Sequence, residues 1–128
     1  MSYWDWDITL DLFVRDLKTG EDRRLTNNTL EGGEVGEYSV ISPDNRQIVY
    51  NWIARDGMAE LRLIGIDGSG AHVIYRDPSA REILPYDWSP DGAVILAASW
   101  KKDGTYQIAL ISTVDGPVRT LKTFKLAS

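Results

Sequence analysis

Apolar and polar residues alternate with a period of two along most of this 128-residue chain. Residues that favour turns interrupt the alternation at intervals of about eight to twelve positions, a spacing typical of all-β domains. Segments with helical periodicity are almost absent. The pattern predicts short strands at 8–16, 21–26, 38–42, 46–54, 59–66, 71–76, 84–89, 93–100, 106–113 and 118–124, with a loop at 27–37.

The turns between the expected strands repeat along the chain, which indicates an internal duplication. A Ser-Pro-Asp motif and an Asp-Gly pair each recur at a shift of 47 residues, and a second Asp-Gly pair recurs at a shift of 48. The matched positions are Ser42–Asp44 with Ser89–Asp91, Asp56–Gly57 with Asp103–Gly104, and Asp67–Gly68 with Asp115–Gly116. Each copy therefore contains four strands joined by three tight turns, which is an antiparallel meander.

A four-stranded unit of about 40–45 residues has the size of a β-propeller blade. The middle strands are apolar on both faces, as in "AVILAA" at 93–98, and this suits sheets that are covered on each side. The segment 12–26 aligns with the second half of the unit. We therefore predict an all-β fold, an incomplete β-propeller in a single domain over 1–128, with a half blade at about 1–30 and full blades at 36–77 and 83–124. A two-sheet sandwich is the alternative, which the repeats disfavour.

The stretches "SPDNRQIVYNW" at 42–52 and "DWSPDGAVILAASW" at 87–100 resemble TolB-type, WD-repeat-like propeller blades. Each is followed by an Asp-Gly turn and a further strand, and the resemblance extends from about residue 8 to 124. Proteins with such blades include periplasmic TolB, the propellers that gate prolyl oligopeptidases and dipeptidyl peptidases, and sensor-like domains of bacterial kinases. Their propellers usually hold about six or seven blades. The resemblance therefore implies a larger bacterial parent protein or an assembly, and it favours a periplasmic or extracytoplasmic location.

Composition narrows the partners that the chain can take. Lys and Arg number 14 against 19 Asp and Glu, a net charge of −5, which argues against a general nucleic-acid binder. The chain has no Cys and a single His, so disulfides, thiolate metal sites and His-rich metal sites are excluded. The start lacks a signal-peptide pattern, and no apolar run reaches the roughly 18 residues that span a bilayer. We predict no cofactor, no metal, no nucleic acid and no membrane insertion.

The motifs in the turns have structural rather than catalytic explanations. In the two Ser-Pro-Asp turns, the residue after the Asp is Asn45 or Gly92, and both of these residue types tolerate a positive φ. The Ser and Asp side chains can form hydrogen bonds with nearby backbone amides. The turn residues are Ser42, Pro43, Asp44, Asn45, Ser89, Pro90, Asp91 and Gly92. The segment "GIDGSG" at 65–70 lacks the following helix of a nucleophile elbow and is expected to be a hairpin turn. Ser69 and His72 share that hairpin, so a catalytic triad is not expected, and the chain is predicted not to be an enzyme.

Charged and aromatic residues are expected to gather on one face of the propeller. This face contains the loops before the innermost strands and the turns between the second and third strands, and such loops commonly carry binding residues. The candidate contact residues are Glu37, Tyr38, Arg55, Asp56, Arg81, Glu82, Tyr86, Lys102 and Asp103. We expect a non-catalytic interaction module that binds a protein or peptide. The alternative is the gating or substrate-binding part of a hydrolase or lyase whose catalytic residues lie outside this chain.

Two and a half blades leave the terminal blade faces open to water. Such faces form large apolar patches, which soluble monomers rarely show, and radial closure normally removes them. We therefore expect self-association, or completion of the blades by a partner, through these faces.

Overall fold

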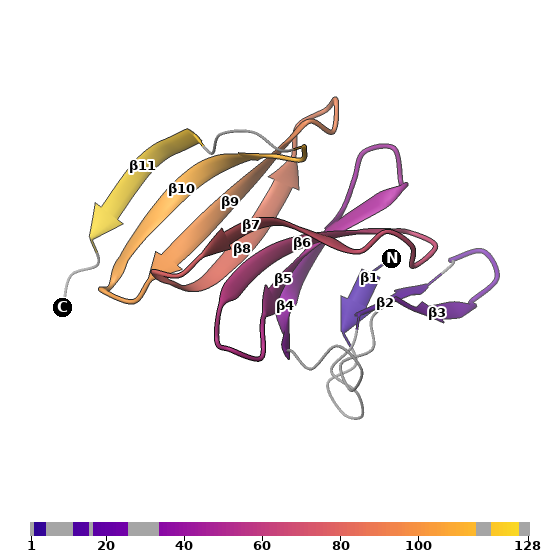
Figure 1. Cartoon of the computed structure of the whole chain (residues 1–128). Helices are drawn as coiled ribbons and strands as arrows, with labels where there is room; N and C mark the ends of the chain where they lie inside the picture. The colour runs from indigo at the N-terminus through magenta and orange to yellow at the C-terminus, as the bar shows by residue number, and fades with distance from the viewer. Residues whose placement is uncertain (1, 5–11, 16, 26–33, 115–118, 126–128) are drawn as a thin grey trace.

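The computed structural model describes residues 2–4, 12–15, 17–25, 34–114 and 119–125, and their regular structure is entirely β-strand (Figure 1). The strands are β1 (Ser2–Trp4), β2 (Leu12–Arg15), β3 (Asp22–Arg24), β4 (Glu34–Ile41), β5 (Gln47–Ile53), β6 (Ala59–Gly65), β7 (His72–Asp77), β8 (Ala80–Trp88), β9 (Val94–Lys101), β10 (Thr105–Ser112) and β11 (Arg119–Lys125). The all-β prediction is confirmed. The described part of the chain contains no helix of the length and apolarity that a membrane span requires.

Three antiparallel sheets follow one another along the chain. The N-terminal sheet has the order β1-β2-β3, the first blade the order β4-β5-β6-β7, and the second blade the order β11-β10-β9-β8. Each blade is a meander in which consecutive strands pair, as the repeated turns predicted. The second blade stacks on the first through β8, which packs across β4, β5 and β6. The predicted domain boundaries stay a prediction.

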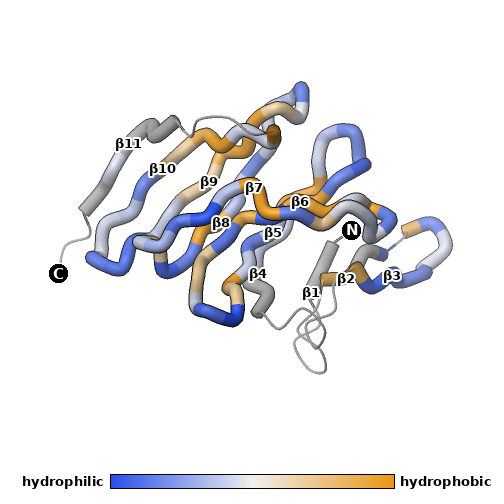
Figure 2. The backbone as a smooth tube through the Cα atoms, in the orientation of Figure 1, coloured by the Kyte–Doolittle hydropathy of each residue, from blue (hydrophilic) through white to orange (hydrophobic). Residues whose placement is uncertain are grey.

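The first blade is buried on both faces because its middle strands are apolar at odd and even positions. On the face toward the second blade, which we call the forward face, Val49, Leu61 and Leu63 are at most 1% exposed. On the opposite face, which we call the rear face, Tyr50 and Trp52 pack in a cluster with residues of the N-terminal sheet. Figure 2 shows apolar stretches along the middle strands and hydrophilic turns at the sheet ends. Stacking of sheets, rather than one shared core, therefore organises the molecule.

Trp88 joins the two blades. Its ring is 6% exposed within the core between them. Its indole Nε1 donates a hydrogen bond to the carbonyl oxygen of Val40, at 3.0 Å, across the interface. Because a buried indole N–H needs an acceptor, this bond fixes how the end of β8 sits on β4.

The two Ser-Pro-Asp turns have the same hydrogen-bond pattern. Asn45 has a φ of 60° and Gly92 a φ of 73°, so both occupy the left-handed region. The Ser42 hydroxyl donates to the Asp44 carboxylate at 2.6 Å and accepts from the Gln47 amide at 3.0 Å. The second turn repeats both bonds at the same lengths. These bonds satisfy backbone groups where each first strand turns into the second.

Two strands begin earlier than the sequence predicted. Strand β4 begins at Glu34, within the expected loop 27–37, because Glu34 and Val35 pair with Ile53 and Trp52 across a bulge. Strand β8 begins at Ala80 rather than at 84, and Ala80 is 1% exposed against the first blade. Both errors arise because turn-forming residues precede each strand, whereas pairing with the next strand decides where it starts.

The N-terminal sheet contains a strand that the sequence analysis did not predict. Strand β1 pairs with β2 along Ser2–Trp4. It contacts β4, the first strand of the next sheet, just as β5 of the first blade contacts β8, the first strand of the second blade. Since β2 and β3 align with β6 and β7, β1 takes the place of a second strand. The repeated turn at Asp115–Gly116 lies outside the described residues.

Candidate functional site

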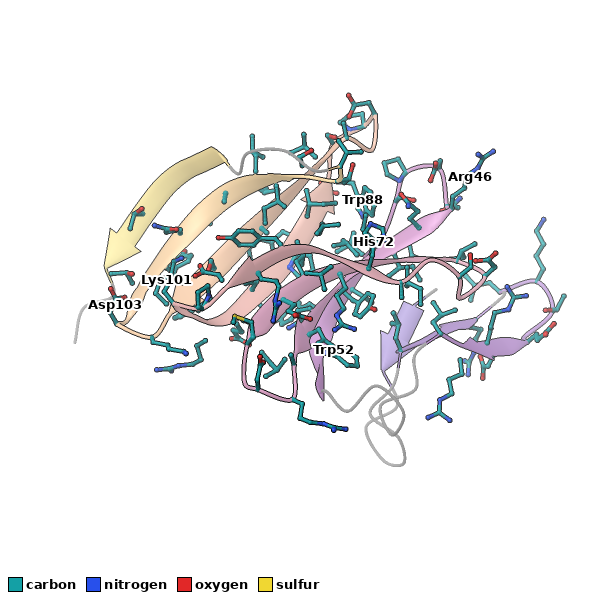
Figure 3. The ribbon with its side chains drawn as sticks, in the orientation of Figure 1. Arg46, Trp52, His72, Trp88, Lys101 and Asp103 are labelled. Atoms are coloured by element: carbon teal, nitrogen blue, oxygen red, sulfur yellow. The ribbon has the colours of Figure 1, made fainter. Side chains whose placement is uncertain are left out.

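Four of the predicted contact residues lie in turns at one end of the blades. Arg55 and Asp56 form the turn between β5 and β6, and Lys102 and Asp103 form the turn between β9 and β10. The Lys102 amide donates to the carbonyl oxygen of Ser79, at 2.8 Å, so the β9–β10 turn adjoins the turn that leads into β8. Figures 1 and 3 show these turns at the ends of the sheets away from Trp88.

The other five predicted contact residues lie in strands, as was expected for Tyr38 and Tyr86, whereas the expectation that Glu37, Arg81 and Glu82 occupy loops is wrong. Glu37 and Tyr38 belong to β4, and Arg81, Glu82 and Tyr86 belong to β8. The side chain of Glu37 is outside the described part of the structure. The cause is the early start of both strands, which turns the expected loops into sheet edges. Their role in binding stays a prediction.

Tyr38 and Tyr86 are exposed on the first strands of the two blades. Each lies within a register shift, between Val35 and Ser39 in β4 and between Pro85 and Asp87 in β8. Their exposed fractions are 43% and 46%. A bulge re-aims the extra residue of a strand, so both tyrosines leave the alternation that would bury them. Both repeats thus present an exposed tyrosine at a bulge of the first strand, although the two are one residue out of register, since Tyr86 matches Ser39 at the shift of 47.

The surroundings of Tyr86 are aromatic and acidic. Burial raises the pKa of its hydroxyl, and nearby Tyr106, Tyr38 and Glu82 raise it further because each disfavours the phenolate. Tyr106 in turn stacks on Trp100, with ring centroids 5.0 Å apart and an interplanar angle of 11°. The hydroxyl of Tyr86 therefore stays protonated at neutral pH and can donate or accept a hydrogen bond, close to the stacked rings of Trp100 and Tyr106.

The bulge that carries Tyr38 is held by a buried amide. Asn51 is 2% exposed, and its side-chain oxygen accepts a hydrogen bond from the Tyr38 backbone amide at 3.1 Å. This bond replaces the ladder bond that the bulge removes. Tyr38 is consequently presented on a fixed backbone, although its ring is exposed.

A buried polar cluster between the blades was missed in the sequence analysis. Asp77, 6% exposed at the end of β7, accepts hydrogen bonds from the Ser79 amide at 2.9 Å, the Ser79 hydroxyl at 2.6 Å and the Ser99 hydroxyl at 3.1 Å. It also forms an ion pair with Lys101 of β9. Burial alone would raise the pKa of Asp77, but the bonds from Lys101 and Ser79 outweigh it and lower the pKa to about 2.

The cluster borders a shallow hollow at the turn end of the second blade. Its volume is about 380 Å³, and it is lined by Ser79, Lys101, Lys102, Asp103, Thr105 and Gln107. The repeat contains a signal for it, because Ser99 and Lys101 stand where the first copy has Trp52 and Ala54 at the shift of 47. Polar residues at two positions that are apolar in the other copy mark a change in the neighbouring interface.

The hairpin at 65–72 shows no catalytic arrangement. The Ser69 hydroxyl donates to Asp67 at 2.6 Å, and His72 Nδ1 lies 2.8 Å from the carbonyl oxygen of Gly70. Within the described ranges, no three His, Cys, Asp or Glu side chains gather as metal ligands would. These contacts are local and stabilise the turn of the hairpin.

No protein-family model matches the sequence, and no curated protein matches it. Among solved structures, a protein assigned as TolB from Agrobacterium tumefaciens is similar at a TM-score of 0.75 and 26% identity, over 91% of this chain and 42% of that chain. TolB from Acinetobacter baumannii is similar at a TM-score of 0.73 and 19% identity, over 94% of this chain and 28% of that one. The chain thus spans less than half the length of either structure.

A third similar structure, an oligogalacturonate lyase in complex with manganese, has a TM-score of 0.42 at 14% identity, which is too low to support an argument about activity. The two TolB structures agree with the duplicated four-stranded unit and with the stacking of sheets face to face. The described sheets are therefore blades of a TolB-type β-propeller, and the chain contributes an incomplete ring of them.

Proposed function

We propose that this chain is a non-catalytic interaction module that binds a protein or peptide on the face built from its two inner strands and the adjoining turns. The observation that carries the proposal is the pair of exposed tyrosines, Tyr38 and Tyr86, at bulges of the first strands β4 and β8. Neither ring takes part in the cores between the sheets. Both copies of the repeat thus keep a large aromatic side chain in water on the first strand of the blade.

Tyrosine supplies contact area and a polar group at a low cost in side-chain entropy, and it is enriched at the centres of protein interfaces. The bulges hold both residues on paired strands, so little backbone order remains to be acquired on binding. On the same strand as Tyr86, Arg81 and Glu82 provide charges of both signs, and Glu82 lies close enough to raise the pKa of Tyr86. A mixed rim of this kind suits a polypeptide partner, which offers both charges, better than a polyanion.

The predicted alternative, a gating or substrate-binding part beside a hydrolase or lyase, has no observation of its own among the described residues. A hydrolytic domain in a longer parent chain would favour it.

The test is a selection of random peptides displayed on phage against the immobilised chain. We expect enriched peptides to bind the unaltered chain and to lose about tenfold or more in affinity against the variant with Tyr38→Ala and Tyr86→Ala, because truncation of two anchor residues removes most of the contact. The matched control is Leu17→Ala, which truncates a 74% exposed side chain on the N-terminal sheet. Peptides that bind equally to all three proteins, or no enrichment at all, would contradict the proposal.

A further inference from the structure

Four Asp-Gly pairs lie in tight turns of the described structure and share one backbone arrangement. In each turn the glycine has a φ between 73° and 89°. Its amide donates a hydrogen bond to the carbonyl oxygen of the residue three positions earlier. Differences in behaviour between the four turns must therefore come from the aspartate side chains. The pairs are Asp56–Gly57, Asp67–Gly68, Asp91–Gly92 and Asp103–Gly104.

Three of the four aspartates accept a hydrogen bond from a hydroxyl group in the same turn. Each also accepts one from the backbone amide two residues further on, at 2.9–3.0 Å. The hydroxyl bond, followed by the amide bond, lowers the pKa of each of these carboxyls because both favour the ionised form. The hydroxyl donors, at 2.6–2.7 Å, are Ser69 for Asp67, Ser89 for Asp91 and Thr105 for Asp103.

Asp56 has no such hydroxyl in its turn, because Met58 stands where the second copy has Thr105 at the shift of 47. Among the described residues, the Asp56 carboxylate accepts a hydrogen bond only from the Met58 amide, at 2.9 Å. Arg76 Nη2 lies 3.9 Å from Asp56 Oδ2, beyond hydrogen-bond distance, and the Asp56 side chain is 62% exposed. Asp56 is thus the least restrained of the four aspartates.

An aspartate that precedes a glycine can react with its own backbone. The glycine amide nitrogen attacks the side-chain carboxyl carbon, a C–N bond forms, and the C–OH bond of the carboxyl breaks, so that its hydroxyl leaves with the amide proton as water. Hydrolysis of the resulting succinimide at either carbonyl gives aspartate or isoaspartate, whose backbone is one methylene longer. Because the carboxyl loses its oxygen in the protonated form, hydrogen bonds that stabilise and position the carboxylate slow the reaction.

We propose that Asp56–Gly57 is a site of spontaneous isoaspartate formation in the folded protein, and that it reacts faster than the other three described pairs. The turn has room to rearrange, since no heavy atom beyond its chain neighbours lies within 4 Å of the place that a Gly57 Cβ would occupy. The extra methylene lengthens a turn that is closed by bonds from Gly57 to Ala54 and from Ala54 to Met58, at 2.8 and 2.9 Å. This reaction needs only water, so the proposal is independent of peptide binding.

The first test is incubation of the full chain under mildly acidic native conditions, followed by peptide mapping. A peptide with isoaspartate has the mass of the parent but a different retention time, and Asp-N protease does not cleave at it. We expect isoaspartate to accumulate at position 56 about threefold or more faster than at 67, 91 and 103, because those carboxylates must first lose a hydroxyl hydrogen bond. In concentrated urea, where the turns are lost, we expect the four rates to converge.

Equal rates in the folded chain, or a faster reaction at 67, 91 or 103, would overturn the proposal. A preference for Asp56 that persists unchanged in urea would also overturn it, because the cause would then be the local sequence rather than the hydrogen bonds of the folded turn.

Reciprocal variants test the hydroxyl group directly. Met58→Thr gives Asp56 the donor that Thr105 gives Asp103, so we expect the rate at Asp56 to fall about threefold or more. Thr105→Met removes that donor and is expected to raise the rate at Asp103 by a similar factor. The unaltered turns of each variant serve as the internal control, because a loss of folding would raise their rates as well.

Ser69→Ala covers the case in which a change at the partly buried Met58 or Thr105 disturbs folding. Ser69 is exposed, and its substitution removes the hydroxyl donor of Asp67 without a change in the core. We expect isoaspartate at Asp67 to form about threefold or more faster in this variant. An unchanged rate at the substituted turn of a folded variant would overturn the proposal.

Discussion

Replacement of Asp77 by Asn tests whether the polar cluster holds the two blades together. The carboxylate lies on the last residue of β7, whereas two of its partners, Ser99 and Lys101, belong to β9 of the next blade. Asp77→Asn keeps the size of the side chain and an acceptor for the Ser79 amide, but it removes the charge opposite Lys101. The lysine side chain is only 14% exposed, so its ammonium group would lose its partner with little water to replace it.

The size of the effect follows from the pKa of Asp77. Folding lowers it from 3.8 to about 2. At 1.36 kcal/mol per pKa unit, this difference corresponds to about 2 kcal/mol of stability from the ionised form. Because the folded-state pKa is below the unfolded one, this stability is fully present above about pH 4 and is lost as the pH falls from there toward about 2. We expect Asp77→Asn to cost about 2 kcal/mol at neutral pH and less in acid.

The assay is urea unfolding followed by tryptophan fluorescence, at neutral pH and at several values between pH 4 and 2. A double-mutant cycle with Lys101→Met isolates the pairwise energy, which we expect to be about 1–2 kcal/mol. The matched control is Asp22→Asn on the exposed pair with Arg15, where a loss below about 1 kcal/mol is expected because solvent screens the charges. An Asp77→Asn loss no larger than that of Asp22→Asn, or one that does not shrink in acid, would refute the reasoning.

Two further changes probe the interface between the blades and the repeated turn. Trp88→Phe keeps most of the apolar area but removes the bond to the Val40 carbonyl oxygen, so we expect a loss of about 1–2 kcal/mol in urea unfolding, and an unchanged midpoint would contradict that role. Gly92→Ala puts a side chain at a φ of 73° with no atom within 4 Å of the new Cβ, so we expect a loss of about 1 kcal/mol from backbone strain alone. Gly92→Asn, which imitates Asn45 of the other copy, should lose clearly less, and equal losses for the two variants would contradict this explanation.

The fold was predictable because the evidence for it is local and repeated. Period-two alternation identifies strands, and the constant shift of 47 between Ser42–Asp44 and Ser89–Asp91 gives the order of strands within each blade. Asn45 and Gly92 were expected to adopt a positive φ, and both do. The apolar pattern on both strand faces likewise predicted sheets covered on each side, and Val49 and Tyr50 lie on opposite faces of β5 in different cores.

The candidate site was predicted less well because its geometry depends on pairing between strands. No local signal places Tyr86 in a bulge, since the register of β8 is decided by which residues of β9 oppose it. The same holds for the early start of β8 at Ala80, which moves Arg81 and Glu82 from a loop into a strand. The residue types were visible in the sequence, but their position at a sheet edge was not.

The sequence by itself determined the all-β class, the four-stranded repeat and the turn residues, because each of these depends on neighbours within a few positions or on a constant shift. Only the tertiary structure decided that Asp77 meets Lys101, 24 residues away, and that β1 adds a third strand to the N-terminal sheet. These contacts depend on how one sheet sits on the next. Stacking is set by the shape and burial of whole faces rather than by any local pattern, so it becomes visible only once the chain is folded.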